Sequence, residues 1–391
     1  MMNSGILAGF GFIFWNICTR LFNPEIVGLG NALISLVTLL ITISTLGFGM
    51  SIIRFLPLSQ RKDRMLNSLF TLSAPFCFSM SLLCLLSIKT LSPRLSFVRE
   101  NILYSAIFII TPVFAVLSLL SESVFLSEKR TKYTLVKNAA FSILKILFLF
   151  VFVPFGAFGI LLSVGISHLI AFILSFFMIL SIIPHYHFNI QFSKDISDMA
   201  TYSFMNYVAQ IIASMPGLLF PLIIINFISA EQNAYFFIPW MIASTLYVIP
   251  SSIASSFFAE SSENITEMEK KFVKAMKFLM IILIFVIPVL LLFGYEILRI
   301  FGESYAHNGY SLLFILTISI LPVGINGISI IKLNIRKEVR KIVLFQALLS
   351  TVIFCIGIPL LFSMGIIGIA IGYFLAHCIG AFCFTFGIIE S

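Results

Sequence analysis

Residues 156–172 read GAFGILLSVGISHLIAF, and residues 365–382 read GIIGIAIGYFLAHCIGAF. Both stretches are apolar and rich in glycine, and with the residues around them each reaches the length of about 20 residues that a bilayer-spanning helix needs. Three positions recur at one constant offset of 209 residues, since Gly156, Gly159 and His168 match Gly365, Gly368 and His377. The chain therefore contains an internal repeat of about half its length.

Two further matches extend the repeat. Lys132 and Lys341 keep the offset of 209, and the stretches 49–55 (GMSIIRF) and 250–258 (PSSIASSFF) share a weaker pattern near offset 201. Both halves begin on the same side of the membrane, so we expect two six-helix bundles related by a pseudo-twofold axis along the membrane normal. The most polar connection lies at mid-chain. It predicts an N-terminal bundle over 1–184, a cytoplasmic linker over 185–198 and a C-terminal bundle over 199–391.

The composition requires lipid as the solvent of most of the surface. The 391 residues are 60% hydrophobic and 10% charged, whereas soluble domains carry roughly 25% charged residues. Backbone groups in lipid must be satisfied within each segment, and the alternating ten-residue pattern of a membrane barrel is absent, so the spans are helices. A length filter predicts an all-α protein with twelve spans, near 4–22, 31–56, 66–90, 101–127, 134–154, 158–183, 199–228, 231–259, 272–298, 309–331, 341–363 and 365–388.

Basic residues mark one side of the membrane. Eighteen Lys and Arg fall in one set of alternate loops and five in the other. An excess of Lys and Arg is typical of cytoplasmic loops, which predicts a plasma-membrane protein with both termini in the cytoplasm. The formal net charge of +8 then indicates contact with anionic lipid headgroups rather than with nucleic acid.

Cofactor and enzyme signals are missing from the sequence. The six cysteines lie inside apolar runs without a CxxC pair, so we read them as packing residues and assign no metal, disulfide or cofactor. There is no HExxH, GxSxG or Walker-type glycine loop, and no connecting loop is long enough for a soluble catalytic domain. The first apolar run lacks a basic leader, which favours a retained helix over a cleaved signal. These features favour a transporter over an enzyme.

Ionisable residues inside spans are the first candidates for a functional site. Lys145 falls near mid-membrane in the fifth span and must face a cavity or a partner; Glu122 is the acidic candidate for such a partner, in a coupling or a structural pair. Arg20 and Arg54 lie near the ends of the first two spans, where a guanidinium either grips phosphate or reaches the interface. His168 and His377 fit proton carriers or helix packing, and we favour packing.

Polar and helix-breaking residues gather in spans seven and eight. Asn206 and Gln210 are candidates for substrate contacts in the seventh span. Proline allows a helix to bend where it lines a cavity, although it also kinks static helices. We interpret four prolines, together with two glycines of the second span, as gate or hinge positions, with close helix packing as the alternative: Pro216, Pro221, Pro239, Pro250, Gly47 and Gly49.

Several stretches resemble one known family. Residues 18–57 (CTRLFNPEIVGLGNALISLVTLLITISTLGFGMSIIRFLP) resemble the opening of polysaccharide-biosynthesis flippases of the multidrug/oligosaccharidyl-lipid/polysaccharide exporter superfamily. Residues 214–260, 302–316 and 365–377 are similar to later parts of the same group. The resemblance covers nearly the whole chain as many weak positions rather than one motif. The first span is shorter than is usual in that group.

The resemblance implies a MATE-like fold, alternating access and a lipid-linked saccharide as cargo, with Arg20 and Arg54 as anion-binding residues. Glycosyltransferases would be functional partners, and a coupling cation is compatible with the family. Two alternatives remain. A cation-coupled drug or metabolite antiporter would typically carry an acidic residue deep in its first half, for which Glu122 is the candidate. A membrane-embedded glycosyl- or acyltransferase would carry an extended outer loop with acidic or histidine clusters, which this sequence lacks.

Overall fold

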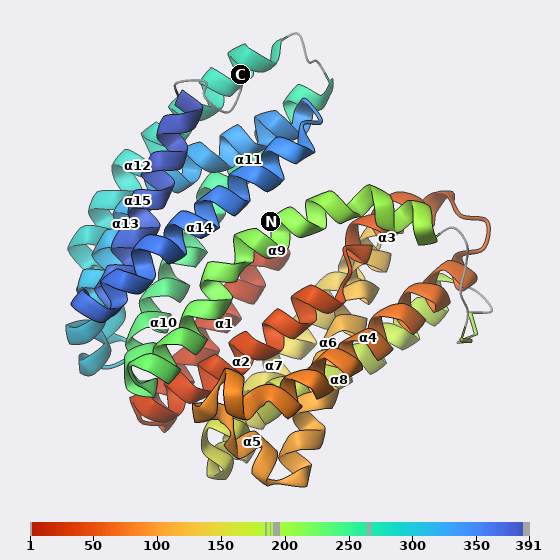
Figure 1. The fold of residues 1–391 in the computed structure, drawn as a ribbon. Coiled ribbons are helices and arrows are strands. Elements are labelled where there is room, and N and C mark those ends of the chain that lie inside the picture. Colours follow the sequence, from red (N-terminus) through yellow and green to blue (C-terminus); the bar gives the residue numbers. More distant parts are fainter. Residues whose placement is uncertain (1, 184–185, 188, 191–195, 264–266, 386–391) are drawn as a thin grey trace. The chain divides into compact units, whose positions relative to one another are not determined.

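The computed structural model describes residues 2–183, 186–187, 189–190, 196–263 and 267–385. Over these ranges the chain folds into helices joined by short turns (Figure 1). The helices are α1 Met2–Leu21, α2 Pro24–Ser44, α3 Phe48–Phe55, α4 Lys62–Leu91, α5 Phe97–Glu100, α6 Ile102–Ser127, α7 Thr131–Phe152, α8 Gly156–Ile182, α9 Ile196–Phe227, α10 Ala230–Leu246, α11 Val248–Glu263, α12 Met268–Arg299, α13 Glu303–Ile335, α14 Val339–Met364 and α15 Ile366–Thr385.

Ten stretches of the described chain are long and apolar enough to cross a membrane. One of them, Thr131–Ile182, holds both α7 and α8 in 52 residues and accounts for two crossings. The shorter apolar helix Gly5–Leu21 lies within α1 and meets the lower limit of about 17 residues for a span. Counted in this way, the described helices make twelve crossings. The prediction of an all-α membrane protein with about twelve spans is confirmed.

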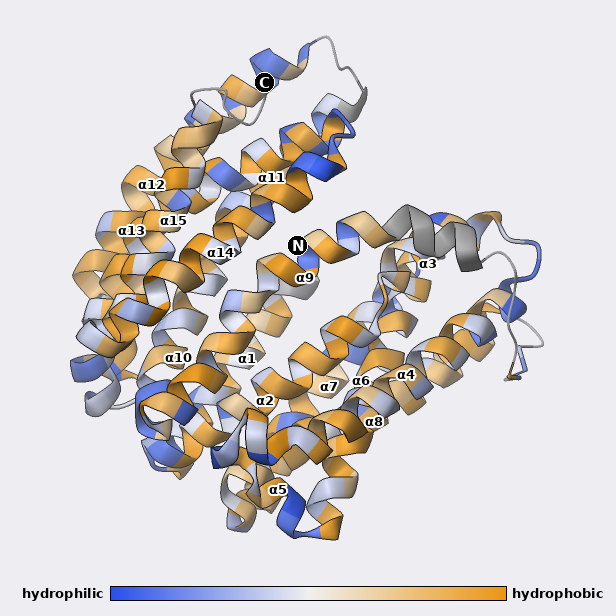
Figure 2. Cartoon of the chain, in the orientation of Figure 1, coloured by the Kyte–Doolittle hydropathy of each residue, from blue (hydrophilic) through white to orange (hydrophobic). Residues whose placement is uncertain are grey.

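Hydrophobic residues run along the helices, and hydrophilic residues gather near their ends (Figure 2). Many large apolar side chains point outward rather than into a core. On α12 the exposed ones include Ile281, Ile284, Phe285, Leu292 and Phe293. A contiguous apolar surface of this kind would aggregate in water, and it matches the hydrocarbon of a bilayer.

The second span begins earlier than predicted and is broken. It starts at Pro24 rather than near residue 31, because the Asn23 side chain accepts a hydrogen bond from the Ile26 N–H at 2.9 Å and caps the helix. After α2 the backbone turns at Leu46 and Gly47, both with positive φ, before α3 continues. The eighth span breaks between α10 and α11 at Tyr247. Tyr247 follows Leu46 by 201 residues, the offset that the sequence indicates for this pair of spans.

Contacts divide the described chain into two compact units. The first comprises the residues up to Tyr207 and Leu218–Asn233, and the second comprises Val208–Gly217 and the residues from Ala234 onward. In the first unit α6 packs against α3, α4 and α8, and α7 packs against α8. In the second unit α13 packs against α11, α12 and α15, and α14 packs against α15. The same six-helix order and packing thus occur twice. The predicted boundaries stay predictions, because the linker 185–198 includes residues outside the described ranges.

Matching turns give the register of the repeat. Between α6 and α7 the Arg130 N–H donates to the Phe125 carbonyl at 2.7 Å, and between α13 and α14 the Glu338 N–H donates to the Leu333 carbonyl at 3.0 Å. Both are helix-ending motifs with a left-handed residue. Tyr133 and Lys341 then bond back to Arg130 and Glu338 in the same way. Lys341 therefore matches Tyr133 at offset 208, and its predicted match with Lys132 is wrong by one residue.

The glycines of the sequence repeat lie in equivalent places. Gly156 and Gly365 have φ of +55° and +67° at the starts of α8 and α15. A Cβ on Gly159 would lie 2.0 Å from the Phe152 carbonyl oxygen, and one on Gly368 would lie 2.2 Å from that of Leu360. Each helix can approach the preceding one only because these positions lack a side chain.

Replacing Gly159 or Gly368 with alanine is expected to destabilise the protein by about 1–3 kcal/mol, as overpacking does. The clash is with backbone, which cannot rotate away as a side chain does. Thermal unfolding in detergent measures the loss. Gly11→Ala on α1 is the control, because nothing lies within 4 Å of its added Cβ. Equal unfolding midpoints for Gly159→Ala and Gly11→Ala would contradict the expectation.

One polar tie joins α4 to the chain after α8, outside the spans. The Tyr186 hydroxyl donates to the Asn67 Oδ1 at 2.8 Å, and the Asn67 Nδ2 donates to the His187 carbonyl at 2.8 Å. Burial, with a smaller effect of Asp63, raises the pKa of the Tyr186 hydroxyl above its usual range. The hydroxyl therefore stays protonated and remains a donor.

Candidate functional site

A lysine is buried in the middle of α7 in the first unit. The Lys145 Nζ lies 5.1 Å from the ring centre of Phe14, on α1, and 5.3 Å from that of Phe141, one turn earlier on α7. Its exposure is 9%. Among the described residues no carboxylate pairs with this ammonium group, and no oxygen accepts a hydrogen bond from it.

The two rings stabilise this charge only in part. A lysine at the centre of a bilayer costs about 2.5–3.5 kcal/mol on insertion scales, and a cation–π contact contributes about 0.5–2 kcal/mol. The ammonium group still has three N–H donors. Lys145 is therefore suited to hold an anionic group of a ligand among the membrane helices.

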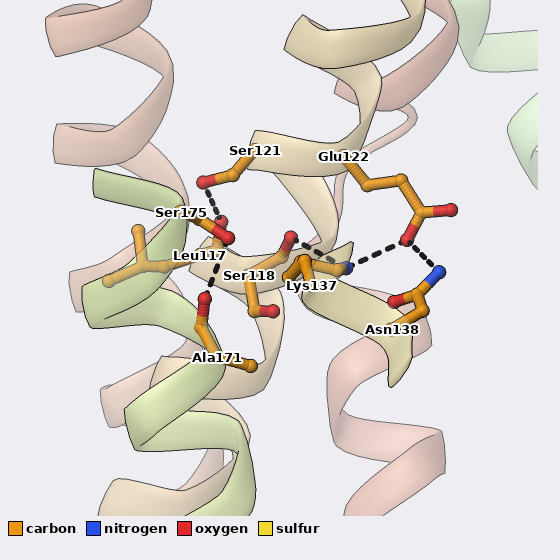
Figure 3. Close-up of polar contacts among 8 residues, drawn as sticks. All are labelled: Leu117, Ser118, Ser121, Glu122, Lys137, Asn138, Ala171 and Ser175. Carbon is orange, nitrogen blue, oxygen red and sulfur yellow. Dashed lines mark hydrogen bonds and ion pairs between the residues drawn. The ribbon is translucent and has the colours of Figure 1, made fainter. Parts of the chain in front are cut away.

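A second lysine of α7 is buried in an ion pair (Figure 3). The Lys137 Nζ lies 2.8 Å from the Glu122 Oε2, on α6, and 3.4 Å from the Ser118 carbonyl. The Asn138 Nδ2 donates to the same carboxylate oxygen at 3.3 Å. Lys137 is 3% exposed, whereas Glu122 is 19% exposed. The pair joins α6 to α7 through charge in a region where unpaired charge is costly.

The ion pair that the structure gives Glu122 is thus with Lys137, and not with Lys145 as the sequence suggested. Lys145 lies eight residues further along α7, about 12 Å by helical rise. Lys137 is one of the eighteen basic residues that the sequence assigns to the cytoplasmic side, although it also falls within the predicted span 134–154. The turn at Lys129 starts α7 early enough to place Lys137 inside the helix.

The second unit contains a cavity of about 380 Å³ lined by α9, α10, α13, α14 and α15. Two aromatic rings line it, those of Trp240 and Tyr373, which meet edge to face with centroids 5.1 Å apart. The described residues that line it include no Asp, Glu, Lys or Arg. The polar side chains that line it are those of Ser214, Asn326, Gln346, Ser350 and His377.

Amide groups of this cavity have unused hydrogen-bonding capacity. The Asn326 Nδ2 lies 3.1 Å from the His377 Nδ1 and donates to the His377 carbonyl at 2.9 Å. The Asn326 Oδ1 is buried and has no partner among the described residues. The Gln346 amide makes no hydrogen bond to the described part of the chain. A buried polar group without a partner costs about 1–3 kcal/mol, which a polar ligand would recover.

The two repeat-related histidines pack differently. The His168 ring lies 4.3 Å from the Phe141 ring, and its Nδ1 is buried without a partner in the described structure. The His377 ring lies 4.4 Å from that of Tyr373 and is held by Asn326. Both contacts are of the helix-packing kind that we favoured from the sequence. His377 also lines the cavity.

The repeat relates the cavity to the Lys145 region. The turns align α6 with α13 and α7 with α14 at offset 208, and α8 with α15 at offset 209. The cavity residues Asn326, Gln346, Ile353 and His377 then match Ser118, Asn138, Lys145 and His168 in the first unit. The matched positions therefore differ in charge at one place, where the first unit has Lys145 and the second has Ile353.

The remaining predicted contact residues lie on α1, α3 and α9. Arg20 is exposed in the last turn of α1, and Arg54 is exposed in the last turn of α3, over the Phe55 ring at 5.5 Å. On α9, Asn206 is half-buried and Gln210 is exposed. Their roles as substrate contacts stay predictions.

The predicted hinge residues lie at a helix break, in the cavity lining and in close contacts between helices. Gly47 has φ +73° at the break before α3, and Gly49 approaches Ser123. Pro216 lines the cavity of the second unit, and Pro221 lies in the same helix, α9. Pro239 and Pro250 pack against Gly309 and Gly324, both on α13. These two prolines are held in close helix contacts, and the gate role of the set stays a prediction.

Sequence reasoning missed Trp240, Tyr373, Asn326 and Gln346. The repeat carried a signal for two of them, since Asn326 and Gln346 match Ser118 and Asn138, which flank the Glu122–Lys137 pair. Nothing in the local sequence distinguishes Trp240 or Tyr373 from packing aromatics. Among the described residues no group of three or more His, Cys, Asp or Glu is placed to hold a metal ion.

Solved structures of transporters share this fold. The lipid II flippase MurJ in an inward closed conformation matches with a TM-score of 0.77 at 16% identity, over 99% of this chain and 87% of that chain. An inward-facing multidrug resistance MATE transporter of the MOP superfamily matches at 0.71 and 15%, over 99% and 94%. A MOP superfamily transporter from Pyrococcus furiosus matches at 0.71 and 15%, over 100% and 94%. At these identities the likeness establishes the fold alone.

The described helices and these matches thus define a membrane protein with the MATE-like fold. The model of the family described as polysaccharide biosynthesis protein matches residues 1–259, about two thirds of the sequence. The chain belongs to that family. Among curated protein sequences none matches it.

Proposed function

We propose that this protein is a flippase that moves a lipid-linked oligosaccharide or polysaccharide precursor across the cytoplasmic membrane by alternating access. The observation that carries the proposal is Lys145, a buried ammonium group without an acceptor in the described structure, in a member of a polysaccharide-biosynthesis family. Lipid carriers of saccharides end in phosphate or pyrophosphate. A cation inside the membrane helices is the group that would receive such an anion.

The orientation of the proposal rests on charge. Two of the eighteen basic residues assigned to the cytoplasmic side, Lys137 and Lys332, are buried in ion pairs with Glu122 and Glu269. The sixteen that are left still outnumber the five on the other side. We therefore place both termini in the cytoplasm of a plasma-membrane protein. The proposal also includes a coupling cation and functionally linked glycosyltransferases as partners of this protein.

Reconstituted protein tests this function directly. Liposomes that contain the protein are expected to translocate a fluorescent polyprenyl-pyrophosphate sugar, and empty liposomes are not. Arg54→Gln is expected to slow the transfer by about threefold to tenfold, as the loss of one exposed charge contact worth about 1 kcal/mol would. Efflux of a cationic dye driven by a sodium or proton gradient, without transfer of the lipid-linked sugar, would replace the proposal with the antiporter alternative.

A further inference from the structure

We propose that the cavity of the second unit, lined by Trp240 and Tyr373, is a binding site for a neutral sugar ring. This proposal rests on the proposed function, because it assigns a place to the saccharide of the lipid-linked cargo. It concerns residues of the second unit only. Sugar recognition needs flat apolar faces together with paired donors and acceptors, and both are present here.

The size and charge of the cavity restrict the ligand. Its volume of about 380 Å³ falls in the range of roughly 300–1,000 Å³ typical of small-molecule sites. The described lining lacks a charged side chain. A phosphate or an organic cation would be left without a counterion among membrane helices, which is costly. A neutral polar molecule avoids that cost.

The aromatic side of the cavity is rigid. The Trp240 indole stacks on Phe236 with centroids 5.3 Å apart and meets Tyr373 at 5.1 Å. From α9, Gly217 lies against the indole, because a Cβ at this position would be 3.4 Å from the Trp240 Nε1. Trp240 is half-buried, so part of it stays accessible. These contacts hold the indole in the lining of the cavity, and an aromatic ring in such a place can pack against the C–H face of a pyranose.

The polar side chains of the cavity offer hydrogen-bond donors and acceptors for sugar hydroxyl groups. Sugar hydroxyls both donate and accept, and a carboxamide does the same through two atoms. The Gln346 amide and the Asn326 Oδ1 lack partners among the described residues. The hydroxyls of Ser214 and Ser350 donate to the backbone carbonyls of Ile211 and Ile212, so their oxygens still accept. Hydrogen-bond donors and acceptors thus line the same cavity as the rings of Trp240 and Tyr373.

The internal repeat shows how the two units differ in charge at one pair of matched positions. Gln346 and Ile353 match Asn138 and Lys145 by register. In the first unit these positions adjoin an ion pair and carry a free cation, as a phosphate site requires. In the second unit the first of these positions is again an amide, and the alkyl chain of Ile353 takes the place of the ammonium group, as a neutral ligand requires. The charge of the first unit thus suits a phosphate, and the neutral lining of the second suits a sugar.

Tryptophan emission tests the site without any transport assay. The chain has two tryptophans, and Trp15 lies on α1 in the first unit, so a Trp15→Phe protein reports on Trp240 alone. It is studied in nanodiscs, because alkyl glycoside detergents are themselves sugars. The probes are glucose, galactose and N-acetylglucosamine at millimolar concentrations, then a short-chain lipid-linked sugar. At least one is expected to change the emission saturably. If Trp15→Phe fails to fold, subtraction of the Trp240→Phe emission from that of the wild-type protein gives the same readout.

Two variants identify the polar contacts. Gln346→Leu is expected to raise the half-saturating sugar concentration about tenfold, as the loss of one or two hydrogen bonds would. Asn308→Leu, which changes an exposed amide of α13 outside the cavity, is expected to leave it unchanged. In liposomes Gln346→Leu should slow a sugar-bearing carrier and leave a bare polyprenyl phosphate unaffected.

The outcomes separate this proposal from the flippase function. Translocation of the lipid-linked sugar without any response of Trp240 to the probes would overturn the sugar site and leave the flippase standing. A saturable Trp240 response without translocation would support the site and overturn the flippase. A response only to sodium ions or to an organic cation would overturn the sugar site in favour of an ion or drug site.

Discussion

A Lys145→Met variant is expected to translocate a polyprenyl-pyrophosphate sugar about ten- to a hundredfold more slowly than the wild-type protein, since a hydrogen bond to a charged group is worth about 1.5–3 kcal/mol. Methionine is an unbranched side chain only one atom shorter than lysine, and it removes the charge that lies over the rings of Phe14 and Phe141. The same variant should slow a bare polyprenyl phosphate, because the loss concerns the anion and not the sugar. Initial rates in liposomes with matched protein content measure the effect.

Two further variants control this result. Lys277→Met removes an exposed lysine of α12 and is expected to keep the wild-type rate, which excludes a general effect of net charge. Lys145→Arg keeps the charge in a longer, planar group and is expected to retain part of the activity. If Lys145→Met moved both carriers at the wild-type rate, Lys145 would not bind the anionic group of the cargo, and the proposed function would lose its main support.

A Glu122→Gln variant is expected to lower the free energy of unfolding by about 3–5 kcal/mol, the usual result of removing one partner of a buried ion pair. The lysine left behind is 3% exposed, and its ammonium group keeps a contact of 3.4 Å with the Ser118 carbonyl. Lys137→Met should cost less, because the remaining carboxylate is 19% exposed and still accepts a hydrogen bond from Asn138. The double variant should be milder than Glu122→Gln alone, since it removes both charges of the pair and leaves neither of them unpaired.

Thermal unfolding followed with a thiol-reactive dye measures these losses, because Cys18 and Cys77 are buried in the folded protein. Glu296→Gln is the matched control, as its pair with Arg299 is largely exposed and should be worth no more than about 1 kcal/mol. If Glu122→Gln and Glu296→Gln shifted the midpoint equally, the pair on α6 and α7 would have no special role in stability.

The number of spans was predictable because the bilayer imposes one length and one composition on every crossing. The repeat was predictable because the glycines at its turns have no substitute: Gly156 and Gly365 take positive φ, and Gly159 and Gly368 lie against backbone carbonyls. Its register was missed by one residue in α7 and α14, because a helix of uniformly apolar residues carries few features by which to align it.

The site was predictable only in its charged half. Lys145 stood out because a charge inside a span is rare in any sequence. The partner of Glu122 was not predictable, because Lys137 and Lys145 lie on the same helix and the α6–α7 turn decides which of them reaches the carboxylate. The neutral cavity was not predictable either, since Trp240, Asn326, Gln346 and Tyr373 come from four helices and each resembles an ordinary packing residue.

The amino-acid sequence by itself determined that lipid surrounds this protein, that it is helical, and about how many helices it has and how they repeat. These features follow from hydropathy and from the need of each backbone group in lipid for a hydrogen bond within the protein. Only the tertiary structure decided which polar groups meet inside each unit. Such meetings depend on helix register and on contacts between residues more than a hundred positions apart, such as Trp240 and Tyr373. The residues next to each of these positions in the sequence do not determine such long-range contacts.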